Sequence, residues 1–508
     1  MKINQLKVGV FLSYVIIILN CAVNIIFSPF MVRQLGQAQY GLYQLIGAFV
    51  GYLTVLDFGL GNAVIKYVAK YRHLKDEKQQ SNFLAIIFIL YVLISLFIAI
   101  LGIVLYFNLQ NIFGASLTGE EIEEAKVMFI ILIINMMIAI PGGIFASIIN
   151  GYEKYIIPRV LSIGRILSRV IVLVAVLTVS ANAINVVIVD TLLNILIILI
   201  NFIVCKKHLK IKMHLYYFDK PLVREVFGYS FFIFLNMIID QLNWKVDQTL
   251  IGIQLSTVAV TIYSVGNTFS SIFQQFSSSI SGVFLPKVTQ MELEHKNGKD
   301  FTNFMIKVGR IQAIILLYIY VAFILFGNQF IKMLYGDGYK ESWISAVLVM
   351  TGLLIPLMQN VGLAILQAKN KHKVYTITFL VATVINAIFT YIILPYTGII
   401  GAAAVTAIGL LIGHTIPLNI YYHFKIHLDM KRFFKELCHG TLVVMIGVII
   451  VMNIMLSLLP VNSWISFLVM AALYTILYFG FMYLFGLQPE EKLQINQFIK
   501  KITKSREI

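Results

Sequence analysis

The sequence predicts an all-α membrane protein, because apolar segments of membrane-spanning length follow one another along nearly the whole chain. Of the 508 residues 59% are hydrophobic and 12% are charged, and the mean hydropathy is +0.88, values far from those of soluble domains. A helix needs about 20 residues to cross the hydrocarbon core. Fourteen segments meet this need, at residues 8–31, 42–66, 82–107, 127–149, 157–178, 184–205, 228–252, 258–284, 309–327, 342–366, 374–394, 399–422, 439–459 and 464–486. Chains of this kind are transporters, channels or membrane-embedded enzymes.

The first apolar segment is expected to be a retained span. It is longer than the core of a signal peptide and has no small-residue cleavage site after it.

The basic residues predict the orientation of the chain. The net charge is +16, yet the connections expected outside hold only Arg33, Lys126, Lys332 and Lys340. Apart from three cations inside spans, the remaining Lys and Arg lie in the termini and in the alternate connections. This distribution follows the positive-inside rule and predicts that both termini are cytoplasmic. We expect the basic loops to face anionic lipids and no nucleic acid to bind.

An internal repeat of six spans is expected. Shifting the chain by 220 residues superimposes spans 1–6 on spans 7–12, with few identities but matching boundaries. The matched pairs are Tyr43 with Tyr263, Gly142 with Gly362, Asn150 with Asn370, and Tyr155 with Tyr375. Two parallel repeats are therefore predicted, with the substrate path between them. The predicted division is an N-lobe at 1–205, a cytoplasmic linker at 206–227, a C-lobe at 228–424, and two extra spans with a basic tail at 425–508.

Polar residues inside the spans are the candidates for function, because such residues are costly in a membrane. Asn236, Asp240, Asn243 and Asp247 lie on one face of span 7. Asn20 and Asn24 in span 1 and Asn267 and Gln274 in span 8 form similar stripes. Such residues either hydrogen-bond between helices or line an aqueous cavity. For the stripe with two carboxylates we favour the cavity.

Three cations lie in the interior of spans, away from the span ends. Arg165 and Arg169 are one turn apart in span 5, and Lys245 lies in span 7. Arg169 lies about 18 Å from the cytoplasmic end of its span, too deep to reach the interface. Two compatible interpretations are a static ion pair with Asp240 between the halves and a basic cavity for an anionic substrate. Asp190 in span 6 stands alone and is expected to be structural.

Asp57 in span 2 precedes Gly59 and Gly61. It is expected either to act as a gating or coupling carboxylate or to cap a break in the helix. The sequence contains no phosphate-binding loop, no zinc-protease motif and no Cys/His cluster. We therefore expect a transporter without an enzymatic activity, cofactor or metal. Its uphill work is expected to use an ion gradient, of H⁺ or Na⁺, or an external partner.

A family resemblance rests on the segment from Phe30 to Gly41 and on the residues after Asp57. Both segments resemble the N-terminal signature of the polysaccharide-type (Wzx-like) flippases of the multidrug/oligosaccharidyl-lipid/polysaccharide (MOP) exporter superfamily. The resemblance covers the length, the six-plus-six arrangement and the two extra spans. The residues that carry it are Arg33, Leu35, Gly36, Tyr40, Gly41, Asp57, Gly59 and Leu60.

The resemblance implies two six-helix lobes around a cationic central cavity lined largely by spans 1, 2, 7 and 8. It implies transfer of an undecaprenyl-diphosphate-linked sugar unit across the bacterial cytoplasmic membrane, next to polysaccharide polymerases or glycosyltransferases. In this interpretation Arg165, Arg169 and Lys245 bind the diphosphate, and Asp57, Asp240 and Asp247 couple to ions.

Three alternative functions are compatible with a chain of this class. A lipid II flippase is the nearest. A drug/cation antiporter of the same superfamily is disfavoured by Arg169. A membrane-embedded glycosyltransferase or polymerase is disfavoured by the short outer connections.

Overall fold

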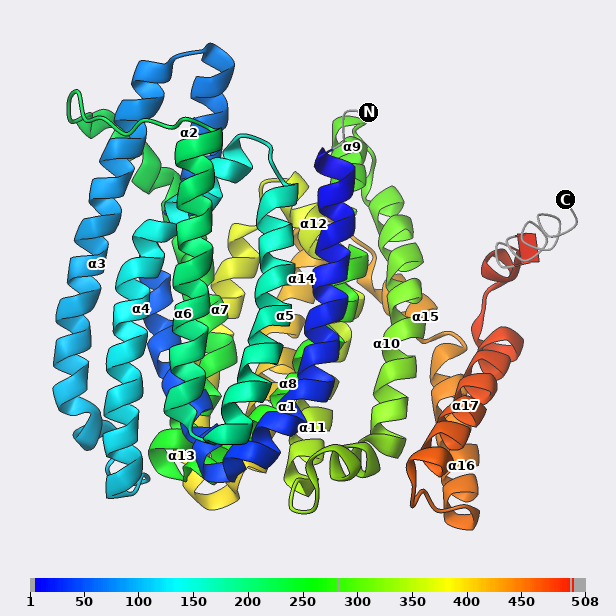
Figure 1. Ribbon diagram of the computed structural model, residues 1–508. Helices are drawn as coiled ribbons and strands as arrows, with labels where there is room; N and C mark the ends of the chain where they lie inside the picture. The colour runs from blue at the N-terminus through cyan, green and yellow to red at the C-terminus, as the bar shows by residue number, and fades with distance from the viewer. Residues whose placement is uncertain (1–4, 282–283, 494–495, 498–508) are drawn as a thin grey trace, which may run out of the picture. The chain divides into compact units, whose positions relative to one another are not determined.

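The computed structural model describes residues 5–281, 284–493 and 496–497, and within these ranges the chain is helical and has no strand (Figure 1). The predicted all-α class is confirmed. The chain divides into two compact units: unit 1 is Met1–Val265 with Ala387–Ala402, and unit 2 is Gly266–Asn386 with Ala403–Ile508.

Unit 1 contains the first seven helices and the beginning of the eighth. The elements are α1 (Gln5–Gly51), the 3₁₀ turn η1 (Tyr52–Asp57), α2 (Leu60–Leu74), α3 (Glu77–Phe113), α4 (Gly119–Gly151), α5 (Ile156–Val179), α6 (Ala183–Ile203), the π-turn η2 (Val204–His208), α7 (Lys220–Gln254) and α8 (Thr257–Ser281). Several helices begin with a side chain that accepts a hydrogen bond from the first turn, and these caps are Asp76, Thr118, Asn182 and Asp219.

The long helix α1 contains a reversal. Gly36 has φ +79° and ψ 165°, and the chain turns back on itself there (Figure 1, dark blue). Because glycine has no Cβ, it adopts this left-handed φ at little cost. The second part of α1, residues 37–51, therefore returns through the bundle and packs against α4 and α6.

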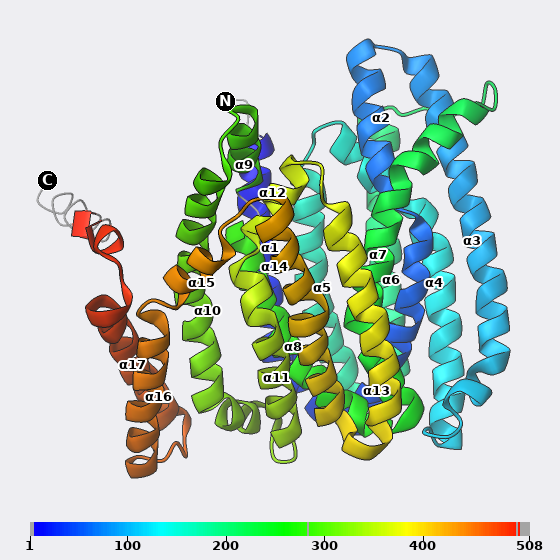
Figure 2. The ribbon, with the colours of Figure 1, turned by 180° about the vertical axis from the view of Figure 1, so that it is seen from behind.

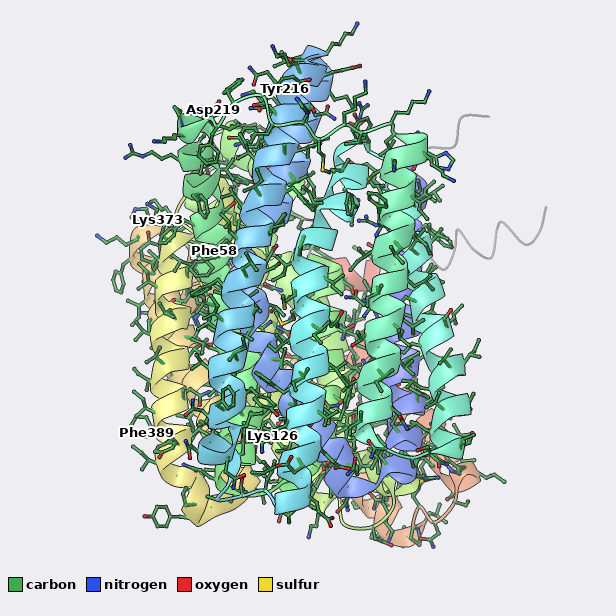
Figure 3. The ribbon with its side chains drawn as sticks, turned by 60° about the vertical axis from the view of Figure 1, so that its left-hand side comes forward. Phe58, Lys126, Tyr216, Asp219, Lys373 and Phe389 are labelled. Carbon is green, nitrogen blue, oxygen red and sulfur yellow. The ribbon has the colours of Figure 1, made fainter. Side chains whose placement is uncertain are left out.

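The segment before α7 is attached to the start of α3. The Asn82 side chain on α3 is fully buried, and its Oδ1 accepts hydrogen bonds from the backbone N–H groups of Tyr216 and Tyr217, at 2.8 and 3.1 Å. Figure 3 shows Tyr216 and Asp219 at one end of this unit and Lys126 at the other. α7 begins at Lys220, eight residues before the predicted start of span 7.

Eleven helical segments within the described ranges are long and apolar enough to cross a membrane. The sequence analysis expected fourteen spans, and the difference has two causes. Val8–Leu74 and Lys373–Lys425 each contain two expected spans, joined through the non-helical residues Gly36 and Gly398. α8 is not among the eleven, because its Asn, Gln, Ser and Thr residues make it less apolar.

Unit 2 holds the later helices. The elements are α9 (Leu285–Leu293), α10 (Gly298–Tyr335), α11 (Lys340–Met358), α12 (Val361–Ala368), α13 (Lys373–Ile408), η3 (Gly409–Thr415), α14 (Ile416–Lys425), α15 (Met430–Cys438), α16 (Thr441–Leu458), α17 (Trp464–Phe481) and η4 (Met482–Gly486), where η3 and η4 are π-turns. α8 and α13 contribute residues to both units. The predicted span 342–366 is interrupted between α11 and α12.

The two extra spans, α16 and α17, lie beside each other and pack against α10 (Figure 2). Two tyrosines of α17 donate to backbone carbonyls of α10. Tyr474 donates to Tyr318 O at 2.6 Å, and Tyr478 donates to Ile314 O at 2.7 Å.

Arg310 on α10 completes this attachment. Only 1% of its side chain is exposed. Its Nε and Nη2 donate to the two oxygens of Glu491, at 2.7 and 2.8 Å. The remaining N–H groups donate to the backbone carbonyls of Glu436, His439 and Gly486, at 2.5, 3.2 and 2.8 Å. All five guanidinium hydrogens therefore have acceptors.

Candidate functional site

Most candidate residues from the sequence lie in unit 1. They are Asn20, Asn24, Asp57, Arg165, Arg169, Asn236, Asp240, Asn243, Lys245 and Asp247. Asn267 and Gln274 lie in the part of α8 that belongs to unit 2, and both are partly buried.

A charged cluster lies inside unit 1 and joins α1, α5 and α6. Arg169 donates from Nε to Asp190 Oδ1 at 2.5 Å and from Nη2 to Asp190 Oδ2 at 3.1 Å. Tyr43 accepts from Arg169 Nη2 at 3.1 Å and donates to Asp190 Oδ2 at 3.1 Å. The side chains of Arg169 and Asp190 are 25% and 20% exposed. The two opposite charges and the hydroxyl form a closed set of bidentate and shared hydrogen bonds.

The helical geometry explains why these residues meet. α5 and α6 are joined by a short turn after Val179. Arg169 lies ten residues before this turn, about 15 Å along the helix, and Asp190 lies seven residues after it, about 10 Å along. The long arginine side chain spans the difference in depth. Tyr43 joins them because the reversal at Gly36 brings the second part of α1 beside α6.

One edge of the Arg169 guanidinium remains available. Nε and both hydrogens of Nη2 are used by Asp190 and Tyr43, whereas Nη1 has no hydrogen-bond partner among the described residues. Arg165, one turn closer to the start of α5, is exposed and makes no hydrogen bond or ion pair with any residue that the structure describes. Two cationic groups with unused donors therefore lie on one face of α5.

The structure corrects one alternative from the sequence analysis. Arg169 pairs with Asp190 and not with Asp240, and Asp190 is not a lone residue. Tyr43, which the sequence analysis matched only to Tyr263, is also part of the cluster. The pairing could have been found by comparing depths from the shared turn, since Arg169 and Asp190 are opposite charges on consecutive spans.

A double-mutant cycle tests whether this pair acts as a unit. We expect Asp190→Asn and Arg169→Gln each to lower the free energy of unfolding by about 3 kcal/mol, since each leaves a partly buried charge without its partner. The double variant should lose less than the sum. Thermal unfolding of the purified protein measures this, with Asp240→Asn as the control at an exposed carboxylate that should change stability by less than about 0.5 kcal/mol. Additive losses in the double variant would contradict the pairing.

The polar stripe of α7 divides into an exposed part and a buried part. Asn236 and Asp240 are exposed, whereas Asn243 and Asp247 are 6% and 3% exposed. The Tyr263 hydroxyl of α8 donates to Asp247 Oδ2 at 2.6 Å. Tyr43 and Tyr263, which the predicted repeat matches, therefore each hydrogen-bond an intramembrane carboxylate.

The remaining unit 1 polar residues differ in burial. Lys245, on another face of α7, and Asn24 are partly buried, and Asn20 is exposed. Lys245 forms no ion pair with any described residue.

Asp57 lies at a break between η1 and α2. Phe58 and Gly59 have φ +53° and +68°, so the chain leaves the helix there and α2 starts at Leu60. The Asp57 carboxylate is hydrogen-bonded by the Tyr91 side chain and the Gly59 backbone. Figure 3 places Phe58 between the two ends of unit 1. The helix break expected at Asp57 is present, and its coupling role stays a prediction.

The other signature residues surround the reversal in α1. Tyr40 is 4% exposed, and its hydroxyl accepts from Gln44 at 2.7 Å. Gly41 contacts the start of α8, where an added Cβ would lie 1.8 Å from the Thr257 carbonyl oxygen. Thr261 donates to Gln37 O at 2.6 Å beside it. The structure therefore explains two signature glycines: Gly36 adopts a positive φ, and Gly41 leaves room for the backbone of Thr257. The signature residue Arg33 is exposed.

The reversal in α1 is also held by carboxylates of α4. Gln39 and Asn182 both donate to Glu124, and Thr257 donates to Glu121 Oε1 at 2.6 Å. Glu121 and Glu124 therefore join the start of α4 to α1, α6 and α8.

The fold is that of the MOP transporters. The structure is similar to the lipid II flippase MurJ in an inward closed conformation, with TM-score 0.71 and 19% identity, covering 94% of this chain and 98% of that chain. It is also similar to an inward-facing multidrug resistance transporter of the MATE family, with TM-score 0.63 and 14% identity, covering 80% and 94%.

The sequence comparisons assign the family. The model of the family described as polysaccharide biosynthesis protein matches residues 6–292, and the chain belongs to this family. An uncharacterized membrane protein of Methanocaldococcus jannaschii is 22% identical over 93% of each chain. A putative O-antigen transporter of Shigella flexneri is 21% identical over 74% of this chain and 87% of its own. The resemblance stated from the sequence is confirmed.

Proposed function

We propose that this chain is a flippase that moves an undecaprenyl-diphosphate-linked oligosaccharide, a polysaccharide repeat unit, across the cytoplasmic membrane by alternating access, with both termini cytoplasmic. The family and the fold support a transporter of this class. The observation that carries the proposal is the guanidinium of Arg169, which is fixed on one edge by Asp190 and Tyr43 and keeps two hydrogens of Nη1 without a partner among the described residues.

A diphosphate suits these donors. A guanidinium offers paired, planar N–H groups to phosphate oxygens, and the attraction is stronger where water is scarce. In the proposal Asp190 and Tyr43 hold Arg169 in position, Nη1 donates to one phosphate, and Arg165 binds the other. Exposed amides such as Asn20 and Asn236 hydrogen-bond sugar hydroxyls.

Ion coupling is the second part of the proposal. Asp57, Asp240 and Asp247 are the carboxylates proposed to bind H⁺ or Na⁺ during the cycle. One elementary charge moved across 100 mV supplies about 2.3 kcal/mol, enough to bias two conformations about fiftyfold.

Lipid II is the second candidate substrate, favoured by the structural similarity to a lipid II flippase over 94% of this chain. Both candidate substrates carry a diphosphate, so the cations of α5 do not distinguish them. The two substrates differ in their sugar and peptide parts.

Arg165→Gln is the sharpest test of the diphosphate interaction, because Arg165 has no partner in the described residues whose loss would disturb folding. We expect flipping of a labelled lipid-linked oligosaccharide in proteoliposomes to fall at least about tenfold, since one charge-assisted hydrogen bond is worth roughly 1.5–3 kcal/mol. Thermal stability should stay unchanged.

The controls separate the parts of this proposal. Lys126→Gln removes a partly buried cation, paired with Glu123, at the opposite end of unit 1 from Tyr216 and should leave transport unchanged. Transport retained in Arg165→Gln and also in the Arg169→Gln/Asp190→Asn double variant would refute the diphosphate role. A rate independent of ion gradients and potential would refute coupling, and preferred transport of lipid II would select the second candidate.

A further inference from the structure

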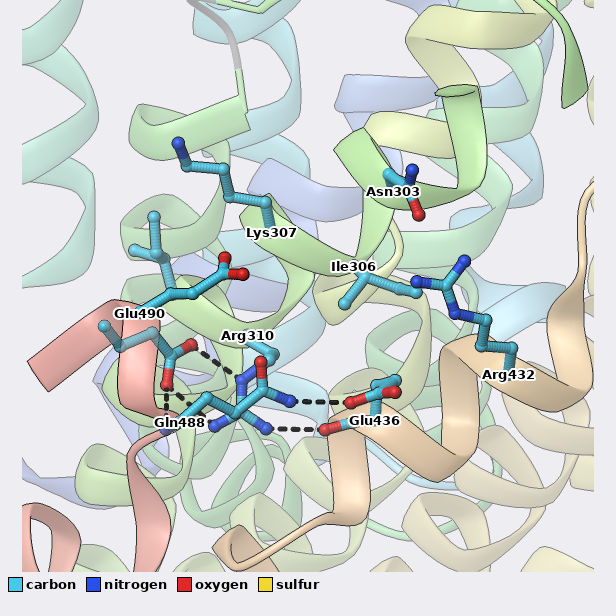
Figure 4. A pocket seen from close by; sticks show the side chains of 10 residues that line it. Asn303, Ile306, Lys307, Arg310, Arg432, Glu436, Gln488 and Glu490 are labelled. Carbon is cyan, nitrogen blue, oxygen red and sulfur yellow. Dashed lines mark hydrogen bonds and ion pairs between the residues drawn. The ribbon is translucent and has the colours of Figure 1, made fainter. Parts of the chain in front are cut away.

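A pocket of about 520 Å³ lies within unit 2, between the first half of α10, helix α15 and the residues after η4 (Figure 4). Its lining includes three cations and three carboxylates, so its formal charge is zero. These residues are Lys307, Arg310, Arg432, Glu436, Glu490 and Glu491.

Half of these charges are already engaged. Arg310 uses all five hydrogens, and both oxygens of Glu491 accept from it. Glu436 accepts a hydrogen bond from Gln488 at 2.6 Å. By contrast, the side chains of Lys307, Arg432 and Glu490 form no hydrogen bond or ion pair with any residue in the described part of the chain. Two cations and one carboxylate therefore remain for a ligand, together with the negative charge of Glu436, which the neutral Gln488 amide does not cancel.

The pocket lies at the level where membrane spans end. Arg310 immediately precedes the apolar part of α10, Arg432 lies near the start of the candidate span Met430–Leu458, and the span containing α17 ends at Gly486. Ile306 and Ile311 also line the pocket, and Ile311 is 42% exposed. Charged residues beside apolar ones at the end of several spans lie where lipid headgroups are found.

We infer that this pocket binds the headgroup of a zwitterionic phospholipid, a phosphate diester joined to a primary ammonium, as in phosphatidylethanolamine. Arg432 donates to the phosphate, and Glu490 accepts from the ammonium. Figure 4 shows Arg432 and Glu490 on different sides of the pocket, so the two charges of the headgroup have separate partners. The inference does not depend on which substrate the protein transports.

The charge balance favours this headgroup over the two common alternatives. An anionic headgroup would satisfy Arg432 and Lys307 but would bring its negative charge near Glu490 and Glu436. A choline headgroup has a quaternary ammonium without N–H groups, so it donates no hydrogen bond to Glu490.

The test compares lipids with identical acyl chains on the purified full-length protein, with binding measured by native mass spectrometry. We expect the first equivalent of phosphatidylethanolamine to bind at least about tenfold more tightly than phosphatidylcholine or phosphatidylglycerol. Arg432→Gln and Glu490→Gln should each abolish this preference. Lys431→Gln, an exposed neighbour on α15, is the matched control and should keep it.

Three results would overturn the inference. Equal binding of the three lipids to the wild-type protein would show that the ammonium is not recognised. A preference that survives in Arg432→Gln and Glu490→Gln would place the lipid elsewhere. Full competition by soluble glycerophosphoethanolamine at equal concentration would show that the pocket takes free phosphate esters and needs no bilayer lipid.

Discussion

Replacing Gly41 by alanine is expected to destabilise unit 1 by about 3 kcal/mol and to reduce the yield of folded protein sharply. The added Cβ would lie 1.8 Å from the carbonyl oxygen and 2.5 Å from the carbonyl carbon of Thr257. Because the obstacle is backbone at the start of α8, no side-chain rotation relieves it, and the helices must separate. Thermal unfolding in detergent and the fraction of monodisperse protein after size exclusion measure the effect.

Gly47→Ala is the matched control for this prediction. Gly47 lies on the same helix, is exposed, and has no atom within 4 Å of the position of an added Cβ. The same substitution there should be neutral or slightly stabilising, because alanine favours the helix. Equal stability of the two variants would mean that α1 and α8 are not in close contact at Gly41.

Replacing Arg310 by methionine is expected to lower the stability of unit 2 by about 3–5 kcal/mol. The change leaves the Glu491 carboxylate and three backbone carbonyls without their donors, in a place where Arg310 itself is only 1% exposed. Arg310→Lys keeps the charge but has three donors on one nitrogen, so it should recover only part of the loss. Thermal unfolding and limited proteolysis after α15 measure both variants.

Lys299→Met provides the comparison, because Lys299 is an exposed cation on the same helix. It should change stability by less than about 0.5 kcal/mol. If Arg310→Met lowered the stability no more than Lys299→Met, the prediction would be wrong. The residues around Glu436 and Glu491 would then be attached to α10 by contacts other than the five hydrogen bonds of Arg310.

Much of the fold could be predicted from the sequence because the membrane imposes a simple pattern. Over its described residues each expected span is mostly helical, with breaks at Phe58 and between α11 and α12, since about 20 apolar residues leave the backbone few other ways to satisfy its hydrogen bonds. The boundaries were less predictable. α7 begins at Lys220 because Asp219 caps it. The first part of this helix contains polar residues such as Lys220 and Arg224, so it is not recognised as part of an apolar segment.

The candidate site was predictable in its residue types and not in its pairings. Arg169 was identified from its depth, which needs only the helical rise. Its partners were not, because Tyr43 lies 126 residues away along the chain and reaches it through the reversal at Gly36. Asp190 appeared isolated because it was considered within its own span. Hydropathy along one helix contains no information about which face a neighbouring helix covers.

The position of α7 has a practical consequence for dissecting the molecule. α7 starts the second predicted repeat, yet it packs against α1, η1 and α2, and the Phe58 and Phe234 rings stack at 4.6 Å. A recombinant fragment that stops at the end of the first repeat would uncover those aromatic and aliphatic side chains and aggregate in detergent. Unit 1 extends to Val265 and includes Ala387–Ala402, so the sequence repeat is a poor guide to where the polypeptide can be cut for expression or for split-protein reporters.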